Sequence, residues 1–131
     1  MATEPAEIND DEILFRRLAP DHLNPDGTTN SNAYKRRGKP DPEISVDLAR
    51  LTWESDALVR AGRPGFHLGV LQVRDVRALG LVVRHAPTPE NPSHTVIEGN
   101  TSKAMCRQLA EITAVRIPPV VPKTNPNPRF D

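Results

Sequence analysis

This sequence has almost none of the residues or apolar runs from which disulfides, zinc sites and membrane-spanning segments are built. Its 131 residues include a single cysteine, Cys106, so no disulfide can form within the chain, and no cysteine and histidine residues stand at zinc-finger spacing. No apolar run approaches the roughly 20 residues that cross a bilayer. The acidic start between Glu4 and Glu12 is the opposite of a basic signal peptide. We therefore expect a cytoplasmic protein that needs no cofactor, no structural metal and no membrane.

Net charge and aromatic side chains are scarce as well. Lysine and arginine together number 17, aspartate and glutamate also 17, and aromatic residues make up 4% of the chain. A balanced charge creates no long-range attraction to nucleic acid, and few rings are present on which bases could stack. A nucleic-acid partner would therefore have to be held by a local cluster of cations.

The apolar residues that are present concentrate between residues 66 and 117, whereas most of the 14 prolines lie elsewhere. A chain of this length suits one buried core. We expect one domain over residues 13–117, with an acidic disordered tail at 1–12 and a proline-rich tail at 118–131. Within the domain, residues 20–42 carry Asn-Pro, Asp-Gly and Pro-Asp-Pro turn signals, which predict a long irregular segment.

Hydrophobic periodicity predicts a mixed fold of the α+β or α/β class. The spacing of Met105, Leu109 and Ile112 places them on one face of a helix that opens at residues 99–102 and stops at Pro118. This amphipathic helix is expected to pack on a sheet of about 3–5 strands. The other predicted elements are strands at 44–48, 66–73, 81–86 and 94–98, helices at 52–60 and 74–79, and either a strand or a helical turn at 13–18.

The first candidate site pairs a histidine with a carboxylate. His94 and Glu98 share one side of the strand predicted at 94–98, and a histidine beside a carboxylate is a recognisable general acid/base pair. The structural alternative is a histidine whose ring nitrogen binds the carbonyl group of a loop.

The second candidate is an anion site at the start of the last predicted helix. Its backbone N–H groups and the positive end of its dipole could hold a phosphate or carboxylate, but the spacing lacks the P-loop pattern and ordinary helix capping accounts for the same residues. The residues assigned to this site are Arg84, Asn100, Thr101, Ser102 and Lys103.

The third candidate is the one dense basic run, which lies inside the irregular segment. Four cations around one ring could contact phosphates while the ring stacks on a base, and the alternative is a solvated loop that offsets the acidic start. The run consists of Tyr34, Lys35, Arg36, Arg37 and Lys39.

Two further groups are expected to carry no chemistry. His67, His85 and His94 all fall on predicted strands, but their spacing matches no zinc motif, so no metal site is assigned. Cys106 lies next to the apolar stripe of the last predicted helix and has no obvious base beside it in the sequence. We interpret Cys106 as a small core residue.

Several short segments resemble small bacterial cytosolic domain proteins of uncharacterised function. The resemblance rests on Ser31-Asn32-Ala33-Tyr34, Ile44-Ser45-Val46-Asp47 and Asn91-Pro92-Ser93-His94. It implies a self-contained bacterial cytosolic module and carries no activity over to any residue.

Three functions remain open at this stage, and the first is preferred. It is a non-catalytic accessory or protein-interaction module of a bacterial cytosolic system, with a protein partner. The second is a small enzyme acting on a nucleotide or phosphoester, with His94 as acid/base and Glu98 orienting it. The third is a nucleic-acid-binding module that uses residues 34–39. Convergence of His94, Glu98 and an arginine in one pocket would favour the enzyme.

Overall fold

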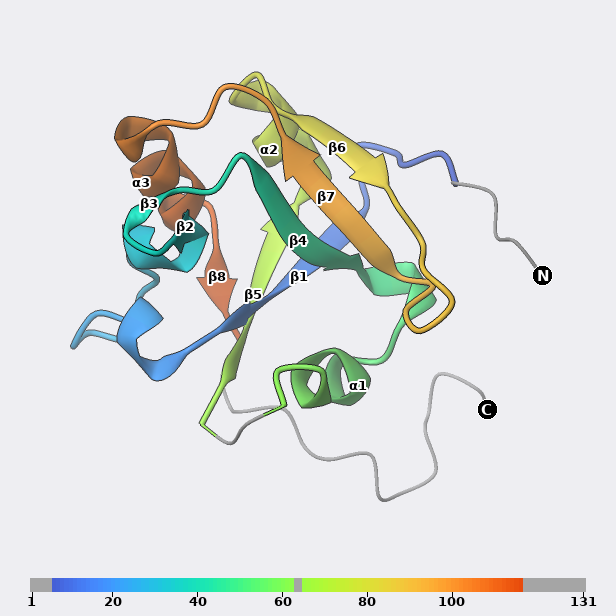
Figure 1. Ribbon diagram of the computed structural model, residues 1–131, viewed down its shortest axis with the longest axis horizontal. Coiled ribbons are helices and arrows are strands. Elements are labelled where there is room, and N and C mark those ends of the chain that lie inside the picture. The colour runs from blue at the N-terminus through green and yellow to red at the C-terminus, as the bar shows by residue number, and fades with distance from the viewer. Residues whose placement is uncertain (1–5, 63–64, 117–131) are drawn as a thin grey trace.

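A six-stranded sheet, antiparallel at every pairing, organises the computed structural model of this chain (Figure 1). The structure describes residues 6–62 and 65–116. The strand order is β6-β7-β4-β1-β5-β8, so strands distant in sequence lie side by side at the centre. Because every pairing is antiparallel, the fold belongs to the α+β type rather than to the α/β type built from parallel strands.

The elements are short and alternate along the chain. The strands of the sheet are β1 (Ile13–Leu18), β4 (Glu43–Leu48), β5 (His67–Gln72), β6 (Val82–His85), β7 (His94–Glu98) and β8 (Ala114–Val115). The helices are α1 (Glu54–Val59), α2 (Val73–Ala78) and α3 (Lys103–Glu111), with 3₁₀ turns η1 (Pro20–His22), η2 (Ser31–Tyr34) and η3 (Ala49–Leu51). The strands β2 (Lys35–Arg36) and β3 (Lys39–Pro40) form a separate hairpin. Among the described residues, no helix has the length and apolar character needed to cross a membrane.

The expected sheet of 3–5 strands was too small, since the sheet has six. The missed strand is β8, which lies where the last predicted helix was expected to continue. Helix α3 ends at Glu111, and the following chain turns back to pair Val115 with Gly69 of β5. A Cβ atom at Gly69 would lie only 2.7 Å from Cγ2 of Thr113, so the close approach of this chain requires glycine.

The main core fills the space between one face of the sheet and the elements α2, α3 and η2. Leu14, Ile44, Leu71 and Ile97 point into it from four strands and are 0–1% exposed. Cys106 of α3 is also fully buried there, as expected for a small core residue. On the opposite face a smaller cluster joins β1 and β5 to α1 and consists of Phe15, Ala57 and Leu68. Helix α1 thus covers only the part of that face near β1 and β5.

The segment at 20–42, expected to be irregular, contains η1, η2 and the hairpin of β2 and β3. It is anchored because Ala33 and Tyr34 are fully buried in the main core. At the hairpin tip, Arg37 and Gly38 have φ angles of 55° and 79°, the positive values that match the twist of a tight hairpin. The turn residues of this segment therefore predict its turns correctly, but they do not predict the short 3₁₀ turns and the hairpin between them.

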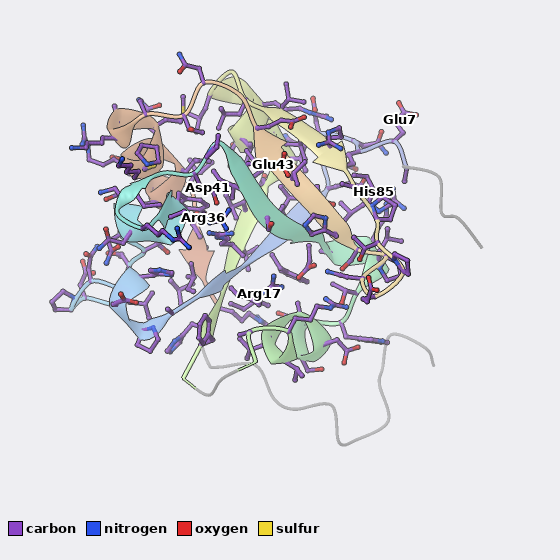
Figure 2. All side chains as sticks on the ribbon, in the orientation of Figure 1. Glu7, Arg17, Arg36, Asp41, Glu43 and His85 are labelled. Atoms are coloured by element: carbon purple, nitrogen blue, oxygen red, sulfur yellow. The ribbon has the colours of Figure 1, made fainter. Side chains whose placement is uncertain are left out.

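The structure also differs from the expected tail at 1–12, because residues 6–12 lie against the domain. Ile8 is buried, and its carbonyl oxygen accepts a hydrogen bond of 2.8 Å from Nη2 of Arg77 in α2. The backbone N–H of Ala6 donates to Nδ1 of His85 over 2.7 Å. Figure 2 shows Glu7 and His85 on the same side of the molecule. The tail predicted at 118–131 lies outside the described residues.

Candidate anion-binding site

Two neighbouring strands diverge at the centre of the sheet, and an arginine bridges the gap. Strands β1 and β4 pair only at Leu14 with Leu48 and at Phe15 with Asp47, after which β4 continues beside β7 alone (Figure 1). Beyond that point Nη1 of Arg16 donates to the carbonyl oxygen of Ser45 over 2.6 Å. Nε and Nη2 of Arg16 donate to the carbonyl oxygen of Ala33 over 3.1 and 2.7 Å. This guanidinium therefore takes the place of missing ladder bonds.

The bridging guanidinium of Arg16 is a buried positive charge. Its three hydrogen bonds all go to neutral carbonyl oxygens, and its carbon atom lies 5.5 Å from the centre of the Tyr34 ring. Burial lowers the pKa of Arg16 below its ordinary value, although Tyr34 and Asp41 partly oppose this effect. An anion nearby would offset the cost of burying this charge.

On the other face of the sheet a buried carboxylate holds two more arginines. Oδ2 of Asp47 lies 2.6 Å from Nη1 of Arg17 and 3.5 Å from Nη1 of Arg60. Oδ1 accepts hydrogen bonds of 2.8 Å from Nδ2 of Asn91 and 3.0 Å from Oγ of Ser93. The Asp47 side chain is 1% exposed, so three hydrogen bonds and the ion pair with Arg60 replace its hydration. Figure 2 shows Arg17 on β1, on the side that faces α1.

A pocket of about 700 Å³ opens beside these arginines, where β1 ends and the chain turns through η1. Three arginines and one histidine line it, and Asp21 is the single acidic residue among its lining residues. Its lining consists of Arg16, Arg17, Ala19, Pro20, Asp21, His22, Arg60, Ala61 and Phe66. We refer to these nine residues as the cationic pocket.

His22 enters the cationic pocket in a defined tautomer. The backbone N–H of Ala19 donates to Nδ1 of His22 over 2.9 Å, so Nδ1 carries no proton and the proton of the neutral ring is on Nε2. Burial lowers the pKa of His22, the charge of Arg16 lowers it further, and Asp21 opposes the shift. His22 is therefore neutral at pH 7 and serves as a hydrogen-bond donor through Nε2.

We expect acidification to destabilise the protein through His22. Because the pKa is lower in the folded state, the unfolded chain binds more protons, and the stabilisation is lost as pH falls below the unfolded value of about 6.5. In His22→Gln the amide oxygen can accept the same N–H at this position without titrating. Urea unfolding at pH 7.5 and 5.5 should show a smaller loss of stability for His22→Gln than for the wild type. An equal loss in both proteins would contradict the expectation.

The structure does not bring His94 and Glu98 together. Nδ1 of His94 donates to the carbonyl oxygen of Ala86 over 2.9 Å, the loop contact of the structural alternative, while Nε2 lies 3.4 Å from Oγ of Ser45. Glu98 instead pairs with Arg84, with 2.9 Å between Oε1 and Nε. The hydrogen bond from Arg84 lowers the pKa of Glu98. His94, Glu98 and Arg84 therefore do not converge in one pocket: His94 binds a loop carbonyl group, and Glu98 pairs with Arg84.

The residues predicted as an anion site at the start of α3 form an ordinary helix cap. Oγ of Ser102 accepts the backbone N–H of Met105 over 3.1 Å, and Thr101 donates its backbone N–H to the carbonyl oxygen of Gly99. Asn100 and Lys103 are exposed beside them. Arg84, assigned to the same site, is held by Glu98 on β7.

The basic run is split between the core and the surface. The Tyr34 ring is fully buried, and its hydroxyl lies 2.5 Å from Oγ1 of Thr113, so it offers no surface on which a base could stack. Burial raises the pKa of Tyr34 to about 12. Arg36, Arg37 and Lys39 are exposed on the hairpin, whereas Lys35 is partly buried. Figure 2 labels Arg36 on this hairpin and Asp41 just after it.

The three strand histidines are not neighbours. His67 begins β5, whereas His85 and His94 lie on β6 and β7, with β1 and β4 between the two groups in the sheet. Within residues 6–62 and 65–116, no three side chains of histidine, cysteine, aspartate or glutamate are grouped as metal ligands.

Sequence reasoning missed the residues that shape the cationic pocket, although one signal was present. Arg16 and Arg17 follow an apolar run in a strand, and successive strand residues point to opposite faces. A sheet covered on both faces must then bury part of at least one arginine. The partners Asp47 and Arg60 lie far away in sequence, so only the fold shows that they meet.

Comparisons with protein families, with curated proteins and with solved structures find no match for this chain.

Proposed function

We propose that this protein is a non-catalytic interaction module of a bacterial cytosolic system, and that it binds an anionic group of a protein partner in the cationic pocket. One observation carries the proposal. Three arginines, Arg16, Arg17 and Arg60, line a pocket of about 700 Å³, against two acidic residues, Asp47, which holds Arg17 and Arg60, and the exposed Asp21. A concave site with surplus positive charge and fixed donors is suited to binding an anion.

The arrangement of the arginines supports binding rather than catalysis. Arg17 and Arg60 are held by Asp47, and Arg16 is held by two carbonyl groups, so the donors are positioned before any ligand arrives. Such preorganisation lowers the entropic cost of association. Among the described residues that line the pocket, no serine, threonine or cysteine stands beside His22 as a nucleophile. The pocket residues are therefore suited to binding a charged group.

A defined acidic peptide tests this proposal. The probe is a ten-residue peptide of alternating Glu and Ser, titrated into the ¹⁵N-labelled protein at low salt and monitored by NMR. We expect the amide signals of Ala19, His22 and Ala61 to shift, and the affinity to fall as salt is added. A peptide of alternating Lys and Ser should leave these signals in place.

Two matched arginine variants locate the binding. Arg60→Gln removes one cation from the cationic pocket and should weaken binding about tenfold, the expected loss of one charged hydrogen bond. Arg107→Gln removes an exposed cation from α3 and should leave the affinity unchanged. The proposal fails if the acidic peptide shifts no signals, or if the shifts fall on the hairpin at Arg36 and Arg37 instead. Shifts on the hairpin would favour the third function, binding of nucleic acid.

A further inference from the structure

The cationic pocket carries more positive charge than one carboxylate group would neutralise. Three arginines line it, two of which, Arg17 and Arg60, share the single buried carboxylate of Asp47, and the other acidic residue, Asp21, is exposed in the lining. The hydrogen bonds of Arg16 all go to neutral carbonyl oxygens, and Tyr34 and Asp41 offset only part of the cost of burying its charge. A ligand with two negative charges at one end therefore matches the site better than a ligand with one.

The placement of the arginine donors also fits a tetrahedral anion. Arg17 and Arg60 both contact Oδ2 of Asp47 through Nη1, and this shared oxygen holds the two guanidinium groups side by side. The Nε and Nη2 atoms of Arg17 make no hydrogen bond within the described part of the chain, since its bonds to Asp47 and Ala57 both leave from Nη1. Two guanidinium groups that present N–H groups from different directions can bind separate oxygen atoms of one phosphate. A planar carboxylate has only two oxygen atoms, which suit a single guanidinium group.

The pocket is too large for a phosphate ion alone. Its volume of about 700 Å³ lies in the range of sites that hold organic molecules. Besides the arginines, Asp21 and His22, the lining consists of the apolar residues Ala19, Pro20, Ala61 and Phe66, and Phe66 contributes a phenyl ring. An apolar wall next to a cationic end fits a ligand with a flat organic part attached to an anionic group.

From these three features we infer that the cationic pocket binds a phosphate monoester with a flat organic part, the phosphate on Arg17 and Arg60 and the flat part along Phe66. This inference rests on the proposed function and names the anion that the site recognises. Asp47 acts as a positioning residue, because it holds both arginines while its own side chain is buried and is not among the lining residues. The same chemistry is found in a phosphotyrosine side chain and in a free nucleotide.

Isothermal titration with four small probes tests the inference. The probes are phenyl phosphate, benzoate, inorganic phosphate and benzyl alcohol, each titrated into the full chain at low salt. We expect phenyl phosphate to bind at least tenfold more tightly than benzoate, which has the ring and one charge. It should also bind at least tenfold more tightly than inorganic phosphate, which has the charge and no ring. Benzyl alcohol should give no heat.

Variants assign each part of the probe to its side of the pocket. Arg60→Gln should weaken phenyl phosphate about tenfold, whereas Arg107→Gln should not change it. Phe66→Ala should reduce the advantage of phenyl phosphate over inorganic phosphate to less than threefold while inorganic phosphate binds as before. Circular dichroism and urea unfolding establish that each variant is folded. If Phe66→Ala does not fold, Phe66→Leu replaces it in this experiment, and we expect a smaller reduction in the advantage of phenyl phosphate over inorganic phosphate.

The outcomes separate this inference from the proposed function. If the acidic peptide binds but benzoate matches phenyl phosphate, the phosphate assignment is overturned and the interaction module stands. If neither the peptide nor any small probe binds, both proposals fall. A phosphotyrosine peptide and adenosine monophosphate then distinguish the source of the ester. Tighter binding of the peptide assigns a modified protein partner, and tighter binding of the nucleotide assigns a free small molecule.

Discussion

Replacing Asp47 by Asn should lower the free energy of unfolding by about 3 kcal/mol, because it leaves two arginines without their shared counter-charge. The amide has nearly the shape of the carboxylate, so packing is preserved. The side chains of Arg17 and Arg60 are 23% and 29% exposed and regain some hydration. Their partial exposure keeps the loss near the lower end of the range for buried ion pairs. Urea denaturation monitored by circular dichroism measures the change.

The exposed ion pair of Arg84 and Glu98 supplies the matched control for Asp47→Asn. Glu98→Gln removes a carboxylate from a pair at the protein surface, where solvent screens the charges, and it should leave the unfolding midpoint unchanged. If Asp47→Asn is as harmless as Glu98→Gln, the carboxylate does not hold the arginines in solution. The geometry of the cationic pocket would then lose its support.

The second large effect is expected at Tyr34. Tyr34→Ala should cost about 3–5 kcal/mol of stability, since it removes a fully buried ring that joins η2 to the main core. It also removes the ring beside the Arg16 guanidinium. Thermal and urea unfolding measure the loss, and because η2 helps to bind Arg16, the variant should also bind anions less tightly.

Tyr34→Phe separates the ring from its hydroxyl group. It retains the buried ring and removes only the hydrogen bond to Thr113, so it should cost about 1 kcal/mol. Thr113 keeps its own bond to the carbonyl oxygen of Leu109. A nucleic-acid-binding role for the ring would require it to be exposed. If Tyr34→Ala were as stable as the wild type, the buried position described above would be wrong.

Much of the fold was predictable because strong local patterns coincide with tertiary structure. The alternating run at 44–48 and the apolar run at 66–73 became β4 and β5, and the short strand at 94–98 became β7. Local patterns fail where long-range pairing decides. Ile112 continues the helical spacing of Met105 and Leu109, yet α3 ends before it, because the next residues pair with Gly69 and Val70 on β5. The periodicity of a single segment gives no information about which distant strand will pair with it.

The candidate site was less predictable than the fold. In the sequence, candidate sites stand out only as clusters of adjacent residues, such as the basic run from Tyr34 to Lys39. The cationic pocket instead combines side chains from β1, η1 and the end of α1. The end of α1 is far from β1 and η1 in the sequence, and these residues form a site with several charges and hydrogen-bond donors only after the chain has folded. Asp47 illustrates the difficulty. In an alternating strand it is expected to face solvent, but Asn91 and Ser93 from a distant loop cover it.

The bridge made by Arg16 has a consequence for how the width of this pocket can change. A cleft framed by two paired strands is altered only when a whole ladder shifts its register. Here one side chain spans β4 and η2 and fixes their separation from β1. Lysine lacks the planar fork and cannot reach both carbonyl groups in the same way. Replacing this one arginine would therefore remove the hydrogen bonds that hold two separate segments of the chain at a set distance from the central strand.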